Sequence, residues 1–167
     1  TCDGRQITVQ SGTYTFPNNT AQQSLSATVS DVNGSVIAYT PPSTAKWVSY
    51  RFYFHWISSG YSGLSHFRIN FDGTDVTDSR ATISSSYDGN HHAELWQSVE
   101  WVFNCDADST SLAAGNVTSW TSAKTIKVTA REYGGSYHAA LHTNKYWDGA
   151  TFSSGVVKPR LTIQAIA

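Results

Sequence analysis

The sequence contains few charged residues, and this scarcity limits the partners that the chain can recognise by charge. Asp, Glu, Lys and Arg make up 14% of the 167 residues, and the formal net charge is −1, whereas soluble domains carry about 25% charged residues. A nucleic-acid or membrane surface is normally marked by a cluster of Lys and Arg, which the sequence lacks. It also lacks any run of about 20 apolar residues. We therefore expect neither a nucleic-acid partner nor insertion into a membrane.

Methionine and cysteine are also scarce. The chain has no Met and begins at Thr1, so we expect a fragment or a processed product of a longer chain. Its two cysteines, Cys2 and Cys105, allow one bridge at most, and their spacing fits no zinc or redox motif. A chain of this length buries about two thirds of its unfolded surface and needs no disulfide for stability. Two free thiols are the simpler interpretation, and a single bridge stays open.

Catalytic signatures are missing from the sequence as well. It contains no Gly-x-Ser-x-Gly motif, no phosphate-binding loop and no dinucleotide fingerprint. The 12 acidic residues lie mostly near predicted turns, although two carboxylates distant in sequence could still meet to hydrolyse a glycosidic bond. We expect a protein that presents a surface to a partner, without enzymatic activity and without a cofactor.

Two clusters of metal-ligand residue types have simpler explanations than a metal ion. His91 and His92 are adjacent, and adjacent side chains on an extended chain point to opposite sides. Asp72, Asp75 and Asp78 are three residues apart, unlike a calcium loop, whose ligands alternate and end in a glutamate. Aspartates of this kind are typical of turns. We expect no metal site.

Alternation of apolar and polar residues predicts β-strands along most of the chain. No segment has a convincing helical period, and the period of two is clearest from residue 46 onward. In that strand the residues on one face are Val48, Tyr50, Phe52, Phe54 and Trp56. The same kind of pattern predicts strands at residues 34–40, 66–72, 76–86, 95–105, 124–133, 136–146 and 158–167.

Turn signals connect these strands into a fold. Asp72-Gly73 between alternating runs is typical of a type I′ hairpin turn, in which both central residues have positive φ. Gly134-Gly135 predicts a second hairpin. About eight strands without helices predict an all-β fold, a jelly-roll-like two-sheet antiparallel sandwich over residues 29–167. The polar residues 1–28 are predicted to form an extended neck segment outside it.

Several loop residues are candidates for contacting a saccharide. Tyr and Trp offer flat apolar faces, while Asn, Asp and His supply hydrogen bonds. Each aromatic candidate has an alternative role in the core or in a subunit interface. The candidates are Tyr61, Tyr87, Asn90, His91, His92, Trp120, Tyr146, Trp147 and Asp148.

Several short strings, in their order and spacing, resemble a known family. They are AYTPPS (38–43), VTDSR (76–80), WTSAKTIK (120–127), LHT with YWDG (141–149) and PRLTIQAIA (159–167). Together they resemble the C-terminal head domains of viral tail fibres, especially those of phages and of large DNA viruses that infect aquatic microbes. The resemblance runs from residue 35 or so to the end of the chain.

The resemblance implies a jelly roll similar to tumour necrosis factor and complement-type heads, assembled as a homotrimer at the fibre tip of an extracellular virion. It further implies adhesion to a host-surface polysaccharide or outer-membrane receptor, and it supplies no catalytic residue. A structural decoration domain and a glycan-degrading enzyme are the alternatives. Interfaces are rich in aromatic residues, so the trimer would use residues opposite the predicted core: Trp47, Tyr53, Trp96 and Val102.

Overall fold

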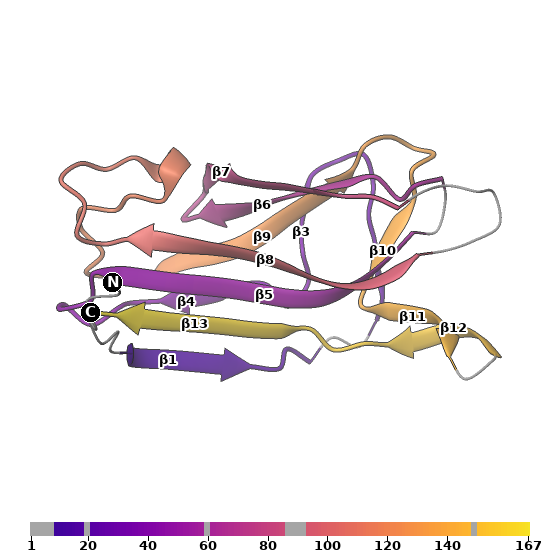
Figure 1. The fold of residues 1–167 in the computed structure, drawn as a ribbon, viewed down its shortest axis with the longest axis horizontal. Coiled ribbons are helices and arrows are strands. Elements are labelled where there is room, and N and C mark those ends of the chain that lie inside the picture. Colours follow the sequence, from indigo (N-terminus) through magenta and orange to yellow (C-terminus); the bar gives the residue numbers. More distant parts are fainter. Residues whose placement is uncertain (1–8, 19–20, 59–60, 86–92, 148–149) are drawn as a thin grey trace, which may run out of the picture.

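Two antiparallel β-sheets packed face to face form the molecule (Figure 1). The computed structural model describes residues 9–18, 21–58, 61–85, 93–147 and 150–167. Within these ranges the helical structure is one 3₁₀ turn, η1 (Leu112–Ala114). None of the helical structure described there is long and apolar enough to span a bilayer. The predicted all-β sandwich is confirmed.

The larger sheet is organised around its longest strand. Its members in chain order are β1 (Val9–Thr15), β2 (Gln23–Ser24), β5 (Trp47–Ser58), β8 (Glu94–Asn104), β10 (Ala139–Leu141) and β13 (Arg160–Ile166). β8 pairs with almost the whole of β5 on one side. On the other side β13 pairs with the first half of β5 and β10 with its end, while β1 and β2 pair with β13 and β10.

The smaller sheet covers the inner face of the larger one. Its members are β3 (Ser30–Asp31), β4 (Ile37–Tyr39), β6 (Ser65–Phe71), β7 (Thr74–Ile83) and β9 (Lys124–Glu132). β9 lies between β6 and the two short strands β3 and β4, and β7 forms the opposite edge. A separate pair, β11 (Thr143–Trp147) and β12 (Ala150–Val156), lies at the end of the sandwich away from the C-terminus (Figure 1).

The order of the strands is that of a jelly roll, in which the chain repeatedly crosses between two sheets. It crosses between β4 and β5, between β5 and β6, between β7 and β8, between β8 and β9, and between β9 and β10. From β4 to β10, within the described residues, β6 and β7 are the consecutive strands that belong to the same sheet. The jelly-roll-like architecture expected from the sequence is therefore present.

The core is built on the inward face of β5, as its alternation predicts. Val48, Tyr50, Phe52, Phe54 and Trp56 are all fully buried. They pack against the inner face of the smaller sheet, where the ring of Phe54 meets that of Phe67 at 5.2 Å between centroids. Burying each such side chain contributes about 1.5–3 kcal/mol, so this row is a main source of stability.

The hairpin turn predicted at Asp72-Gly73 is confirmed. The two residues have φ values of 50° and 89°, and the flanking residues Phe71 and Thr74 pair directly. Positive φ at both central positions matches the right-handed twist of the flanking strands. The turn therefore fixes the register of β6 and β7 at this end.

The N-terminal part of the described chain belongs to the sandwich, so a boundary at residue 28 does not separate a neck from the head. β1 pairs with β13 from Val9 to Thr15, and β2 pairs with β10. The physical reason lies in β13, whose inward residues are buried and whose second edge needs a hydrogen-bonding partner. β1 supplies that partner.

The second predicted hairpin, at Gly134-Gly135, is wrong. β9 ends at Glu132, and the next strand, β10, pairs with β5 in the other sheet. The segment 133–138 is therefore a crossing between sheets. Local turn residues do not distinguish a hairpin from a crossing, because the partner of the following strand is decided by long-range packing.

Candidate functional site

Three tyrosines gather at one end of the sandwich, and we call them the tyrosine cluster: Tyr61, Tyr133 and Tyr137. The ring centroids of Tyr61 and Tyr137 lie 5.7 Å apart, and Tyr133 meets Tyr137 edge to face at 5.3 Å. Tyr61 and Tyr133 are 52% and 56% exposed. The cluster therefore presents aromatic surface to solvent.

Backbone hydrogen bonds hold the loops that carry the tyrosine cluster. The amide of Tyr133 donates to the carbonyl of Leu64 at 2.8 Å and joins the segment after β9 to the segment after β5. The amide of Tyr137 donates to the carbonyl of Gly134 at 2.9 Å and closes the turn between the two tyrosines. The aromatic surface is thus attached to the ends of two core strands.

The sequence prediction found one member of the tyrosine cluster and missed two. Tyr61 was predicted as a loop aromatic, and the structure places it there. Tyr133 and Tyr137 were assigned to predicted strands on either side of Gly134-Gly135. Their signal was present in the string Tyr-Gly-Gly-Ser-Tyr (133–137), because two tyrosines across a short turn come close together whatever the turn connects.

The other loop candidates lie in β11, in the core or outside the described residues. Tyr146 and Trp147 lie in β11, where they pair with Thr151 and Ala150 of β12, and their side chains are outside the described part of the structure. Also outside the described residues are Tyr87, Asn90, His91, His92 and Asp148.

Trp120 is a correction to the prediction, because it is a core residue. It is 6% exposed, and its ring meets Phe71 at 4.8 Å and Phe103 at 5.7 Å between centroids. Its Nε1 donates to the carbonyl of Tyr39 at 3.0 Å. Trp120 lies just before β9 and contacts the ends of β6 and β8, which belong to different sheets, so its indole is buried in the apolar core at this end of the sandwich.

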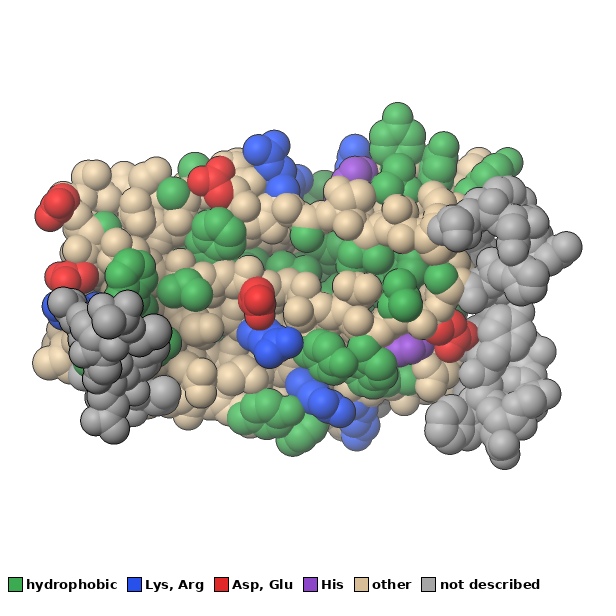
Figure 2. Space-filling model, viewed as in Figure 1, with side chains coloured by type: hydrophobic (Ala, Val, Ile, Leu, Met, Phe, Trp, Pro, Cys, Tyr) green, Lys and Arg blue, Asp and Glu red, His purple; other side chains and the backbone are tan. Residues whose placement is uncertain are grey.

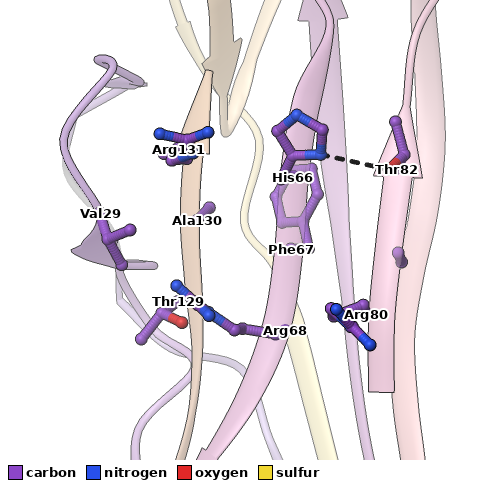
Figure 3. Close-up of a pocket in the computed structure, with 10 residues that line it drawn as sticks. Val29, His66, Phe67, Arg68, Arg80, Thr82, Thr129, Ala130 and Arg131 are labelled. Atoms are coloured by element: carbon purple, nitrogen blue, oxygen red, sulfur yellow. Dashed lines mark hydrogen bonds between the residues drawn. The ribbon is translucent and has the colours of Figure 1, made fainter. Parts of the chain in front are cut away.

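A basic depression adjoins the tyrosine cluster on the outer face of the smaller sheet (Figure 3). It has a volume of about 330 Å³. His66 connects the two features, since its ring lies 6.2 Å from that of Tyr133. We call it the arginine depression after the side chains that line it, among them Arg68, Arg80 and Arg131.

The four predicted interface residues lie on the outer face of the larger sheet, part of which Figure 2 shows. Trp47, Trp96 and Val102 are 42%, 41% and 51% exposed. Tyr53 stacks on Trp96 with centroids 4.8 Å apart and rings nearly parallel. The guanidinium of Arg160 lies 5.5 and 5.4 Å from the centroids of these two rings, a cation–π distance.

One ion pair lies on this outer face. Arg51 of β5 and Glu100 of β8 are register partners, and their side chains approach to 3.3 Å. Exposed pairs of this kind contribute little to stability. The two charges of this pair cancel each other, whereas the guanidinium of Arg160 adds a positive charge beside the stacked rings.

Asp72 and Asp75 of the first hairpin pair with basic side chains. Asp72 accepts a hydrogen bond from Lys124 at 2.7 Å, which holds the pKa of that carboxyl below its usual value. Asp75 approaches Arg68 to 3.0 Å. Over the described ranges, no three His, Cys, Asp or Glu side chains are grouped so that they could share a metal ion.

Two buried titratable groups lie away from the tyrosine cluster. His142 is fully buried with φ of 62°, and its ring contacts Phe52 and Phe54 edge to face. Burial lowers its pKa to about 4. Cys105 is a free, partly buried thiol whose pKa is raised by burial to about 11, and such a thiol is unreactive at neutral pH.

Comparison with known proteins found no matching family model and no matching curated protein. The similar solved structures include the following two. One is the C-terminal domain of EclA, a sugar-binding protein, with 9% identity and a TM-score of 0.34 over 80% of this chain and 74% of that one. The other is from infectious bursal disease virus, Gx strain, with 11% identity and a TM-score of 0.37 over 97% of this chain. This chain matches 37% of the length of the virus chain.

Proposed function

We propose that this domain is the trimeric head of a viral fibre and that it binds a saccharide on the host surface without cleaving it. The observation that carries the proposal is the tyrosine cluster. Two of its members are more than half exposed, although large aromatic side chains bury well and their exposure on a fixed loop is costly unless a ligand covers them.

Physical chemistry favours a sugar as the ligand of the tyrosine cluster. A pyranose ring has an apolar face of C–H groups that stacks on an aromatic ring, and its hydroxyl groups need hydrogen-bonding partners at the edge of that ring. Tyrosine offers both the flat face and a hydroxyl. The edge-to-face arrangement of Tyr133 and Tyr137 presents two differently oriented surfaces to such a ring.

The trimer belongs to the same proposal. A stacked pair of aromatics, a second exposed tryptophan farther along β5 and an ion pair lie on one sheet face, and exposed aromatic residues of this kind are typical of subunit interfaces. Three heads on one fibre would engage a repetitive glycan together, which raises the effective concentration at each site up to millimolar. Weak individual sites are then sufficient for adhesion.

A glycan array probed with the complete 167-residue chain tests the proposal. We expect binding to a subset of surface glycans, and loss of that binding in the double variant Tyr61→Ala/Tyr133→Ala. Val36→Ala is the control, because Val36 is 55% exposed and lies beside Pro17 and Ile37, outside both the tyrosine cluster and the outer face of the larger sheet. Retained binding in the double variant would overturn the site.

A product assay on each bound glycan separates adhesion from degradation. We expect no new reducing ends after prolonged incubation. Release of fragments would instead indicate a glycan-degrading enzyme. If the intact chain binds no glycan, the result would contradict adhesion and would favour the alternative role as a structural decoration domain.

A further inference from the structure

The arginine depression is formed by three strands that pair side by side. β6 supplies His66 and Arg68, β7 supplies Arg80, and β9 supplies Thr129 and Arg131. In Figure 3 the side chain of Arg68 extends over β9 toward Thr129, while His66 and Arg131 lie together farther along the strands. Cations from separate strands thus share one face.

An irregularity in β7 places Arg80 in this group. Phe67 pairs with Ala81 and Ile69 with Val76, so residues 77–80 lie opposite Arg68 alone. Ser79 replaces the missing ladder contacts, because its hydroxyl accepts from the amide of Ile69 at 2.8 Å and donates to the carbonyl of Val76 at 2.6 Å. Bulges of this kind redirect side chains and are frequent beside functional sites.

The charges of the arginine depression are poorly compensated. Asp75 pairs with Arg68 at 3.0 Å, but within the described ranges Arg80 and Arg131 make no ion pair. Arg80 is held by its own strand, since its Nε donates to the carbonyl of Thr77 at 2.7 Å. Two guanidinium groups therefore keep most of their donors available in a chain whose net charge is −1.

A buried hydroxyl group in the same depression has no partner. Thr129 is 7% exposed, and its Oγ1 makes no hydrogen bond in the described part of the chain. Figure 3 shows this oxygen on the side that faces Arg68. Buried polar groups are nearly always paired, and an orphan requires a specific explanation. An acceptor atom delivered by a ligand provides one.

We propose that the arginine depression binds an oxyanion, a carboxylate, sulfate or phosphate group, carried by an acidic saccharide. Guanidinium groups bind such anions with paired, charge-assisted hydrogen bonds, and the volume falls at the lower end of the range of ligand sites, about 300–1,000 Å³. The saccharide part of the inference rests on the proposed function. His66 joins this depression to the tyrosine cluster, so one sugar would stack on tyrosine while an acidic group occupies the depression.

Nucleic acid is the less suitable polyanion for this site. Its recognition needs a basic track along many phosphates, whereas the three arginines are confined to one depression. A single anionic group on an otherwise uncharged sugar matches both the small number of cations and the adjoining aromatic rings.

Calorimetric titration of the complete chain tests the inference. The probes are methyl glucuronide, galactose 6-sulfate and mannose 6-phosphate, each with one anionic group, the corresponding uncharged sugars, and a DNA duplex. We expect one of the acidic sugars to bind at least about tenfold more tightly than its neutral counterpart, with the advantage shrinking as salt is added. The acidic sugar that binds identifies the anion as carboxylate, sulfate or phosphate.

Variants assign the binding to these arginines. Arg80→Gln/Arg131→Gln should abolish the preference for the acidic sugar and leave the weaker affinity for the neutral one. Arg80→Lys/Arg131→Lys should retain part of the preference, because the charge remains while the paired donors are lost. Lys46→Gln, which removes an exposed cation paired with Asp106, is the control and should leave the preference unchanged. Circular dichroism verifies that each variant is folded.

The outcomes separate this inference from the proposed function. Equal affinity for acidic and neutral sugars, with loss of both in the tyrosine variant, overturns the acidic specificity and leaves the adhesive function in place. An unchanged preference in the double glutamine variant overturns the assignment to these arginines. DNA binding as tight as that of the acidic sugar overturns saccharide recognition. Should no sugar bind, a titration with inorganic sulfate that perturbs the amide signals of β6, β7 and β9 would support the anion site alone.

Discussion

Acidification should destabilise the folded chain through His142. Its ring is fully buried between aromatic side chains, and burial lowers its pKa from the ordinary 6.5 to about 4. Between these two values the unfolded chain binds a proton that the folded chain does not bind. The stability that neutral His142 provides is therefore complete above pH 6.5 and decreases as the pH falls toward 4.

The magnitude follows from the interval between the two pKa values. At 1.36 kcal/mol per pH unit, the interval from 6.5 to about 4 corresponds to about 3 kcal/mol. Small domains have a total free energy of unfolding of about 5–15 kcal/mol, so this loss is a large fraction of the whole. Below pH 4, His142 causes no further change in the free energy of unfolding.

Urea denaturation at pH 7, 6, 5 and 4 measures this effect. The matched variant is His142→Asn, because asparagine tolerates the positive φ of this position and does not titrate. We expect the free energy of unfolding of the parent chain to fall by about 3 kcal/mol more than that of the variant over this range. The difference removes the contribution of other groups, such as the exposed Asp72. Parallel curves for the two proteins would refute the reasoning.

Two other predictions follow from packing. Gly115→Ala should lower the free energy of unfolding, measured by urea denaturation, by about 2 kcal/mol. The reason is that Gly115 has a φ of 76° and that an added Cβ would overlap the indole of Trp101. An unchanged free energy of unfolding would contradict this prediction. In sedimentation at micromolar concentration, the measured mass should be three times the monomer mass of 18.3 kDa. The variant Val102→Asp should dissociate the trimer into monomers, because the new carboxylate would be buried in the interface without a partner. Val36→Asp, at a site 55% exposed away from that face, is the control, and a parent chain that sediments as a monomer would disprove the trimer.

Local sequence patterns predicted the strands and the core well. The alternation in β5 selected five residues that are fully buried, and Asp72-Gly73 selected a hairpin turn with the expected backbone angles. These predictions depend on side-chain period and turn chemistry, which act over a few residues. They hold because one face of each central strand is covered by the other sheet.

The functional surface was predicted less completely, because its residues come from distant segments. Tyr61 was recognised as a loop aromatic, but its contact with Tyr137 depends on the crossing of residues 133–138 between the sheets. Trp120 resembled a loop ligand in sequence, and only packing against Phe71 and Phe103 reveals it as core. Composition also gave no sign of a basic site, since the arginines are scattered along the sequence.

By itself, then, the sequence determined an all-β sandwich, the apolar row at its centre and the turn between β6 and β7, since each of these is encoded by neighbouring residues. The tertiary structure decided which strands pair, and with them the positions of Arg68, Arg80 and Arg131. Strand pairing brings residues from β6, β7 and β9 within a few ångströms regardless of their separation along the chain. A charge cluster on one sheet face therefore leaves no cluster in the sequence.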